Sequence, residues 1–312
     1  MQKYSRRRAV AFLLAPLLRH LHLDAQSLAT APATPPHVPA DSPAGAQTRT
    51  TARTYRADAV ILFLGISIYR RAGVGDGKAS LEETFEGANL RRTLFFAAGS
   101  DPKRASGLSR LGWMCEVVFG PATTPSEIAY SGVLTSSPEE SLEHARKSVA
   151  APPSGRSIFS AVSGRNTAGH SRSAITHFEF DASIAWSDRA LIDRAESTFD
   201  AKATWRETSW PNSPDQAPPT FLYQLATLLR KRSRSATGRY VYGEQEYLLG
   251  LELQQPSAER LLPVRGKIRN VRTGYETPFR LWLDEASESV VPVRFEFQPR
   301  SFLRLTFEAV NA

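Results

Sequence analysis

The last third of the chain alternates apolar and polar residues with a period of two. In its final segment, Leu303, Leu305 and Phe307 alternate with Arg304 and Thr306. Successive side chains of a strand point to opposite faces, so this alternation predicts a strand with one buried and one solvated face. The pattern recurs in four other segments, 178–184, 247–253, 279–283 and 293–297. We therefore expect a sheet with one apolar face.

The first half of the folded region also contains strand-like segments. Residues 55–69 are rich in β-branched and aromatic side chains and predict a long strand. The glycine-rich run 73–77 is expected to be a turn that leads into a second strand over 78–85. Small and polar residues at 154–169 are expected to form a loop. Two further apolar runs have the length of strands, 90–97 and 113–119.

Three segments that interrupt the strands predict helices. At 137–140 the sequence Ser-Pro-Glu-Glu combines a capping serine, a proline in the first turn and a glutamate three residues after the cap. The helix that it begins is expected to end near residue 149. A second helix is predicted over about 187–199, and a third over about 219–232, where apolar residues recur with helical spacing.

Together these elements predict a mainly β protein. We expect a single antiparallel, barrel-like or strongly curved sheet of about ten to twelve strands, with about three accessory helices over an end or a face. Neither a repeat of fixed period nor a shift in composition divides residues 54–312. This range is therefore assigned to one β-barrel-like domain.

The first 31 residues have the pattern of an export signal. Lys3 and the arginines at 6–8 are followed by an apolar run at 9–18, and Ala-Thr-Ala at 29–31 fits a cleavage site. We predict a signal peptide at 1–31; the alternative is an amphipathic N-terminal helix. Residues 32–53 are rich in Pro, Ala and Thr and are predicted to be a disordered linker, because they bring too little apolar surface to offset the entropy of ordering.

Charge and cysteine content narrow the possible partners. The chain has 312 residues and a net charge of +8, but residues 1–31 carry five positive and one negative side chain, so the remainder carries only about +4. Basic stripes with interleaved aromatic residues are absent from the sequence, so we expect no nucleic-acid partner. The single cysteine, Cys115, has no partner for an internal disulfide and is expected to be a small buried hydrophobe. Past the apolar run, the sequence lacks a stretch of about 20 apolar residues, so the mature chain is expected to have no transmembrane span.

Three C-terminal motifs are similar to those of a known family: Tyr240-Val241-Tyr242-Gly243-Glu244, Phe279-Arg280-Leu281-Trp282-Leu283-Asp284 and Val291-Pro292-Val293-Arg294. On these motifs the chain resembles the domain of unknown function 3108 family of exported bacterial proteins. The resemblance implies a barrel-like β fold related in shape to lipid-binding barrels. It implies no catalytic residues.

The sequence contains no recognisable catalytic or metal-binding motif. Gly73-x-Gly75-x-Gly77 lacks the spacing of a dinucleotide-binding loop, and a G-x-S-x-G sequence is absent. His144, His170 and His177, which follow the linker, have no spacing typical of metal ligands. We therefore predict that the protein is not an enzyme, with no catalytic residue, no cofactor and no metal.

An aromatic and apolar set remains as the candidate ligand-binding site: Phe221, Tyr223, Leu225, Tyr240, Tyr242 and Trp282. These residues are expected to line an apolar cavity in the barrel; the alternative is that they fill its core. The leading hypothesis is an exported protein of the bacterial periplasm or cell envelope that binds an apolar or lipid-like ligand. The alternatives are a non-catalytic scaffold or adaptor that binds envelope proteins through exposed strand edges, and a hydrolase.

Overall fold

The computed structural model describes residues 47–310, except 64–65, 102–103, 105–110, 122, 136–155, 182–183, 185–188, 243 and 301–302. The predicted signal peptide, the first part of the predicted linker and the first predicted helix lie outside the described residues.

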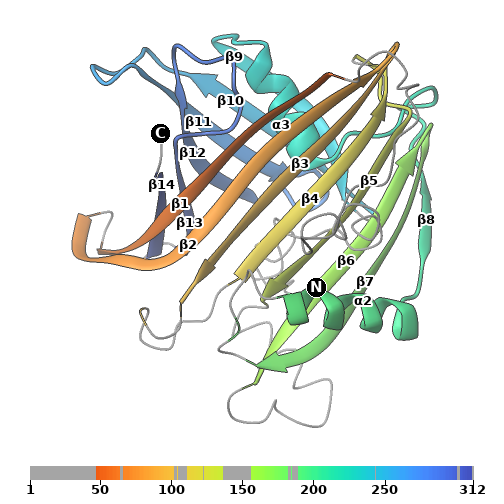
Figure 1. Cartoon of the computed structure of the whole chain (residues 1–312), viewed down its shortest axis with the longest axis horizontal. Helices are drawn as coiled ribbons and strands as arrows, with labels where there is room; N and C mark the ends of the chain where they lie inside the picture. The colour runs from red at the N-terminus through yellow and green to blue at the C-terminus, as the bar shows by residue number, and fades with distance from the viewer. Residues whose placement is uncertain are drawn as a thin grey trace, which may run out of the picture.

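Fourteen strands form one sheet in which every neighbouring pair is antiparallel (Figure 1). Their order across the sheet is β8-β7-β6-β5-β4-β3-β2-β1-β14-β13-β12-β11-β10-β9. In chain order the strands are β1 (Gln47–Phe63), β2 (Ile66–Glu86), β3 (Asn89–Ser100), β4 (Leu111–Gly120), β5 (Glu127–Thr135), β6 (Arg156–Thr167), β7 (His170–Asp181), β8 (Arg206–Ser209), β9 (Ser235–Tyr242), β10 (Gln245–Leu253), β11 (Leu261–Asn270), β12 (Glu276–Asp284), β13 (Arg294–Arg300) and β14 (Leu303–Ala309).

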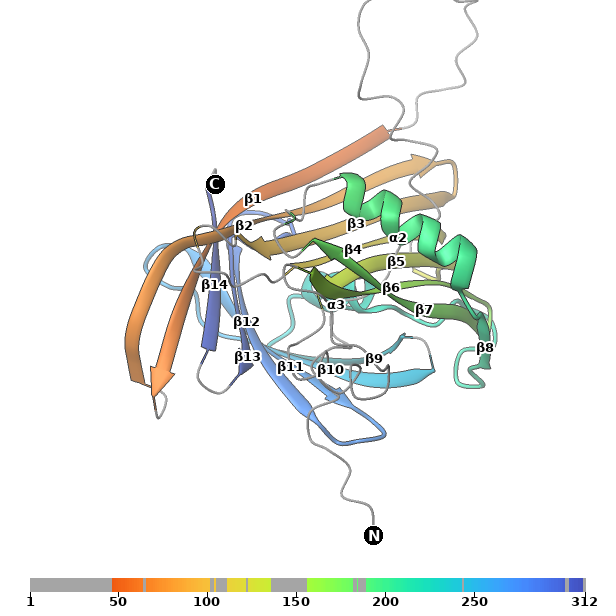
Figure 2. The same cartoon turned by 90° about the horizontal axis from the view of Figure 1, so that it is seen from below.

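The sheet curls so that its two halves face each other (Figures 1 and 2). The first and last strands, β1 and β14, pair in the middle of the sheet from Tyr55↔Ala309 to Ile61↔Leu303. The strands at the two edges are β8 and β9, and Arg206 of β8 donates from Nη1 to Oε1 of Glu244, beside β9, at 3.1 Å. Because both ends of the folded chain meet at the centre, the sheet is one structural unit.

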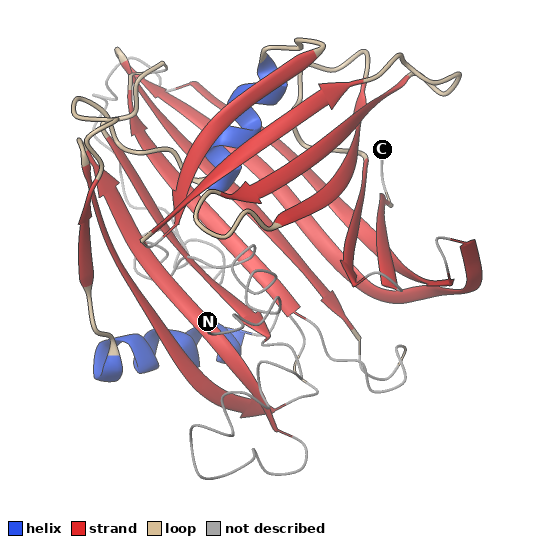
Figure 3. Ribbon diagram, turned by 180° about the vertical axis from the view of Figure 1, so that it is seen from behind, coloured by secondary structure: helices blue, strands red, loops and turns tan. Residues whose placement is uncertain are grey.

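Two helices lie on opposite faces of this sheet (Figures 2 and 3). Helix α2 (Arg189–Lys202) covers the outer face, where its Leu191 and Ala195 join a buried cluster with Trp113 and Cys115 of β4. Helix α3 (Phe221–Arg230) lies inside the curve and packs on β4, β9 and β10. The structure therefore has an inner and an outer core, separated by the strands that both helices cover. No helix of the described chain combines the length and the apolarity that crossing a membrane requires.

The predicted fold class, a mainly β chain with a strongly curved antiparallel sheet, is confirmed. The strand number is higher than predicted, because β5, β6 and β8 were not expected. Strand β6 was expected to be a loop because many of its side chains are small. In the structure these small residues are packed: Ala161 lies in the outer core beneath α2, and the Tyr130 ring covers Gly164 on the inner face. Such residues conceal the alternation of a strand. The second and third predicted helices correspond to α2 and α3.

The glycine-rich run 73–77 is not a turn, contrary to prediction, because β2 continues through it. Gly73 has a φ of 63° and forms a bulge opposite β1, where its N–H donates to Asp58 Oδ1 at 2.8 Å. Gly75 lies so close to β3 that a Cβ atom would overlap the Gly99 carbonyl oxygen. These glycines bend a long strand and let its neighbour approach. The strand predicted over 55–69 is also divided differently: β1 runs from Gln47 to Phe63, and residues 66–69 belong to β2. Residues 47–53 are therefore part of the sheet and not of a linker.

Replacing Gly75 with alanine tests the close approach of β2 and β3. We expect Gly75→Ala to lower the free energy of unfolding by about 2 kcal/mol, because the added methyl group forces two backbones apart. Gly250→Ala is the matched control, since the nearest atom to its Cβ position is the Lys267 carbonyl oxygen at 4.0 Å. Its effect should stay within about 0.5 kcal/mol. Urea denaturation measures both, and equal effects would contradict this account of the run.

Candidate functional site

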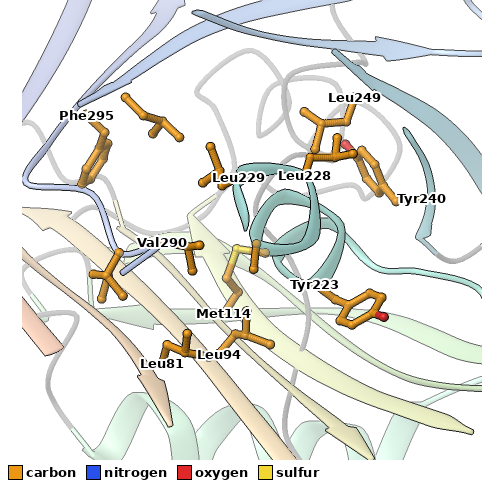
Figure 4. Close-up of a cluster of buried hydrophobic side chains, with 14 of the residues drawn as sticks. Leu81, Leu94, Met114, Tyr223, Leu228, Leu229, Tyr240, Leu249, Val290 and Phe295 are labelled. Carbon is orange, nitrogen blue, oxygen red and sulfur yellow. The ribbon is translucent and has the colours of Figure 1, made fainter. Parts of the chain in front are cut away.

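Helix α3 forms the centre of the inner core (Figure 4). Its buried side chains are Tyr223, Ala226, Leu228 and Leu229. Figure 4 shows Leu228 on the side of Leu249 and Tyr240, and Leu229 on the side of Phe295. Those strand residues belong to β9, β10 and β13, and Figure 4 also shows Met114 of β4 beside the helix, so α3 packs on strands from both halves of the curved sheet.

A buried carboxylate, Glu116 of β4, caps the N-terminus of this helix. Oε1 accepts the backbone N–H of Leu222 at 3.0 Å and the Tyr242 hydroxyl at 2.8 Å. Oε2 accepts the backbone N–H of Tyr223 at 2.8 Å and the Thr220 hydroxyl at 2.5 Å. Thr220, at the N-cap position, makes no capping bond of its own. Glu116 thus satisfies first-turn N–H groups that the buried helix start would otherwise leave without a partner.

Burial is the main influence on the ionisation of this group. It raises the pKa of Glu116, while the hydrogen bonds from Thr220, Leu222, Tyr242 and Tyr223 act in the opposite direction without cancelling it. Burial next to this carboxyl also raises the pKa of Tyr242. The arrangement joins β4, α3 and β9 through a single residue.

At the other end of α3, Arg230 enters a partly enclosed cleft of about 280 Å³. Its Nη2 donates to Glu83 Oε1 of β2 at 2.7 Å, and Arg92 Nε donates to the same oxygen at 2.8 Å. Arg49 and Glu288 also line the cleft, and Arg49 Nη1 lies 3.8 Å from Glu288 Oε2. Burial acts to raise the pKa of Glu83, but the hydrogen bonds and charges of Arg92 and Arg230 outweigh it, so the pKa lies below its ordinary value. We interpret this cleft as an ion-pair network that fixes the end of the helix.

Part of the inner face remains apolar and only half-buried. We call this set the inner apolar surface: Phe96, Phe221, Leu222, Leu225, Phe279, Phe297 and Leu305. Phe297 lies opposite both Phe279 and Leu305 in the sheet register. The rings of Phe221 and Phe279 are 6.4 Å apart, so the surface continues from the strands onto α3. Its members come from β3, β12, β13, β14 and α3, which are distant in the sequence.

The structure divides the residues predicted to bind a ligand into three groups. Phe221 and Leu225 belong to the inner apolar surface. Tyr223, Tyr240 and Tyr242 are almost completely buried and fill the inner core, as the alternative interpretation expected. Trp282 was predicted to line the interior, but it lies on the outer face, where Arg294 Cζ is 4.6 Å from the centre of its ring. Its neighbours Leu281 and Leu283 point inward instead, because side chains alternate along a strand.

Sequence reasoning missed the central role of Glu116 and five members of the surface: Phe96, Leu222, Phe279, Phe297 and Leu305. The alternation of the strands places Phe297 and Leu305 on an apolar face, which was the available indication. Glu116 had one indication as well, since it is a charged residue inside an otherwise apolar run at 113–119.

Groups that would favour hydrolysis or metal binding are sparse in the described part of the chain. It contains no cluster of three or more His, Cys, Asp or Glu side chains placed to hold a metal ion. Ser160 Oγ lies 3.0 Å from His177 Nδ1, but this pair is exposed on β6 and β7. A nucleophile activated for acyl transfer works in a site that excludes water and supplies oxyanion donors.

Comparisons with known proteins provide little further information. No protein-family model and no curated protein match the chain, so the resemblance to the domain of unknown function 3108 family stays a prediction. Among the solved structures that match is a beta-barrel-like protein of domain of unknown function DUF1849 from Brucella abortus, with a TM-score of 0.43 and 7% identity. The similarity covers 83% of this chain and 95% of that one. A similarity of this degree does not indicate a function.

The cap on α3 can be tested with Glu116→Gln. Each carboxylate oxygen of Glu116 accepts one backbone N–H, from Leu222 or from Tyr223. In the glutamine variant, either orientation of the side-chain amide therefore places its NH₂ group against one of these N–H donors. We expect the free energy of unfolding to fall by about 2 kcal/mol or more. Glu82→Gln, at an exposed position of β2, is the control and should change little. Urea denaturation followed by circular dichroism measures both; a Glu116→Gln protein as stable as the control would refute the capping role.

The ion pairs of Glu83 predict a dependence of stability on pH. Because its pKa is lowered in the folded state, Glu83 stabilises the protein above its unfolded-state pKa, and this contribution is lost as the pH falls through the folded-state value. We expect the Glu83→Gln protein to lose less stability than wild type between about pH 5 and pH 3. Denaturation at several pH values gives the two slopes, and parallel slopes would contradict the assignment. Because the pKa of Glu116 is raised, this residue gives a pH dependence of stability of opposite sign, and that dependence is the same in wild type and in the Glu83→Gln protein.

Proposed function

We propose that this protein is a non-catalytic, exported protein of the bacterial envelope that binds an apolar or lipid-like ligand on its inner apolar surface. The observation that carries the proposal is the inner apolar surface itself. Apolar side chains converge there from four strands and one helix, yet remain only half-buried, while the neighbouring inner core is closed. Apolar patches of this kind are typical of ligand grooves and interaction sites.

The energetics favour a ligand without charge at its bound end. All seven members of the surface are hydrophobic side chains packed against the inner core, so a ligand that covers them buries apolar area. Removing such surface from water contributes about 25 cal/mol for each Å² of apolar area. A flexible hydrocarbon segment meets this requirement, since it can follow the curve of the sheet between α3 and β13.

Export is proposed from the pattern of residues 1–31, and the absence of catalysis from the absence of catalytic motifs in the sequence. The scaffold alternative has less support, because it depends on accessible strand edges. The edge strand β8 contains only four residues, and its Arg206 forms an ion pair with Glu244 beside the opposite edge. The β8 edge therefore offers no long template for another strand, which leaves the eight-residue strand β9 as the edge that such a partner would use.

Binding can be measured with a fluorescent fatty acid, cis-parinaric acid, titrated into the purified protein. We expect the double variant Leu225→Asn, Phe297→Ser to bind the probe roughly tenfold more weakly, because two apolar contacts are lost. Phe119→Ser, which removes an aromatic ring from the outward side of β4, is the control and should bind like wild type.

Circular dichroism and urea midpoints establish that each variant is folded, and Leu222→Gln serves as a milder substitution if the double variant is not. Native mass spectrometry of protein isolated from a bacterial envelope fraction then identifies any natural ligand by mass. A wild-type protein that does not take up the probe, or a double variant that binds it normally, would overturn the proposal.

A further inference from the structure

The ends of β1 and β2 extend beyond the sheet as a hairpin (Figure 2). Strand β1 pairs with β14 only as far as Ile61, and β2 pairs with β3 only from Gly75 onward. Residues 66–69 therefore pair with β1 alone, through Phe63↔Ile66, Leu62↔Ser67 and Ile61↔Tyr69. We call residues 66–69 the hairpin arm.

The hairpin arm carries three of the four most exposed large apolar side chains in the described part of the chain. Ile66 is 69% exposed, Ile68 is 62% exposed and Tyr69 is 57% exposed. The other exposed apolar residues, such as Phe119 and Ile175, are scattered singly over the molecule. Three such side chains on one projecting element cost solvation free energy unless something covers them.

Basic side chains surround the base of the hairpin arm. Arg70 and Arg71 follow it directly, and Arg304 of β14 lies opposite Val60. Two carboxylates lie nearby, Glu308 of β14, which is close enough to act on Arg70, and Asp58, which is buried and accepts Arg70 Nη2 at 2.5 Å and the Gly73 N–H at 2.8 Å. Asp58 thereby fixes the bulge from which the arm projects, while the Arg70 side chain stays 60% exposed. Arg56, Arg70, Arg71 and Arg304 outnumber the carboxylates Asp58 and Glu308, so the net charge beside the hairpin arm is positive.

We propose that the hairpin arm binds the surface of an anionic phospholipid bilayer. Ile66 and Ile68 enter the boundary between headgroups and acyl chains, and Tyr69 occupies the interface, where its ring and hydroxyl suit both environments. Arg70 and Arg71 meet the lipid phosphates, for which guanidinium groups are good donors. The apolar side chains of the hairpin arm and the arginines at its base match this partner in polarity and in charge.

Co-sedimentation with vesicles tests the proposal independently of ligand binding on the inner surface. The purified full chain is mixed with vesicles of phosphatidylglycerol and phosphatidylcholine, or of phosphatidylcholine alone. We expect binding to the anionic vesicles that weakens with salt. The double variant Ile66→Asn, Ile68→Asn should bind at least about tenfold more weakly, and the control Ile175→Asn should bind like wild type. Both variants should keep the wild-type affinity for cis-parinaric acid.

A second measurement covers the case in which the double variant does not fold. An Ile66→Trp protein should gain fluorescence that brominated phospholipid quenches, compared with wild type under the same conditions. Failure of wild type to bind anionic vesicles, or equal binding by the double variant, would overturn the proposal. So would sedimentation equilibrium that shows wild type as a dimer and the double variant as a monomer, because the hairpin arm would then be covered by a second copy of the chain.

Discussion

The structure depends above all on the hydrogen bonds that Glu116 accepts at the start of α3. A helix that begins inside a curved sheet has N–H groups that water cannot reach, and each one without a partner would oppose folding. A carboxylate from β4 satisfies two of them and also accepts the hydroxyl groups of Thr220 and Tyr242. The helix is consequently fixed to the first half of the sheet by its cap and to the second half by Tyr242 and by its apolar side chains.

The same helix is fixed at its other end by charge. Arg230 in its last turn meets Glu83 of β2, so an acidic group lies at the N-terminus and a basic side chain at the C-terminus, as the helix dipole favours. Two carboxylates from different strands thus determine where α3 lies within the curve. Its position decides which apolar residues of the inner face are enclosed and which, such as Phe279 and Phe297, stay half-exposed.

Strand β1 connects the two proposed binding regions. Its Ala59 lies opposite Leu305 of the inner apolar surface, and its end pairs with the hairpin arm. Asp58, between these points, faces the other side of the sheet and holds the bulge that bends β2. A protein that binds an apolar ligand and a membrane surface would have both regions on one continuous element.

The sequence by itself determined the fold class and most of the strands, because the alternation in segments such as 303–309 requires no knowledge of neighbouring strands. It also located α3 and two members of the inner apolar surface, Phe221 and Leu225. Only the tertiary structure decided that 73–77 bends a strand, that β6 is a strand, and that Trp282 faces outward. These outcomes depend on contacts between residues distant in sequence: Gly73 with Asp58, Gly164 with Tyr130, and Trp282 with Arg294. The same holds for Glu116, whose role as a cap exists only once β4 and α3 are packed together.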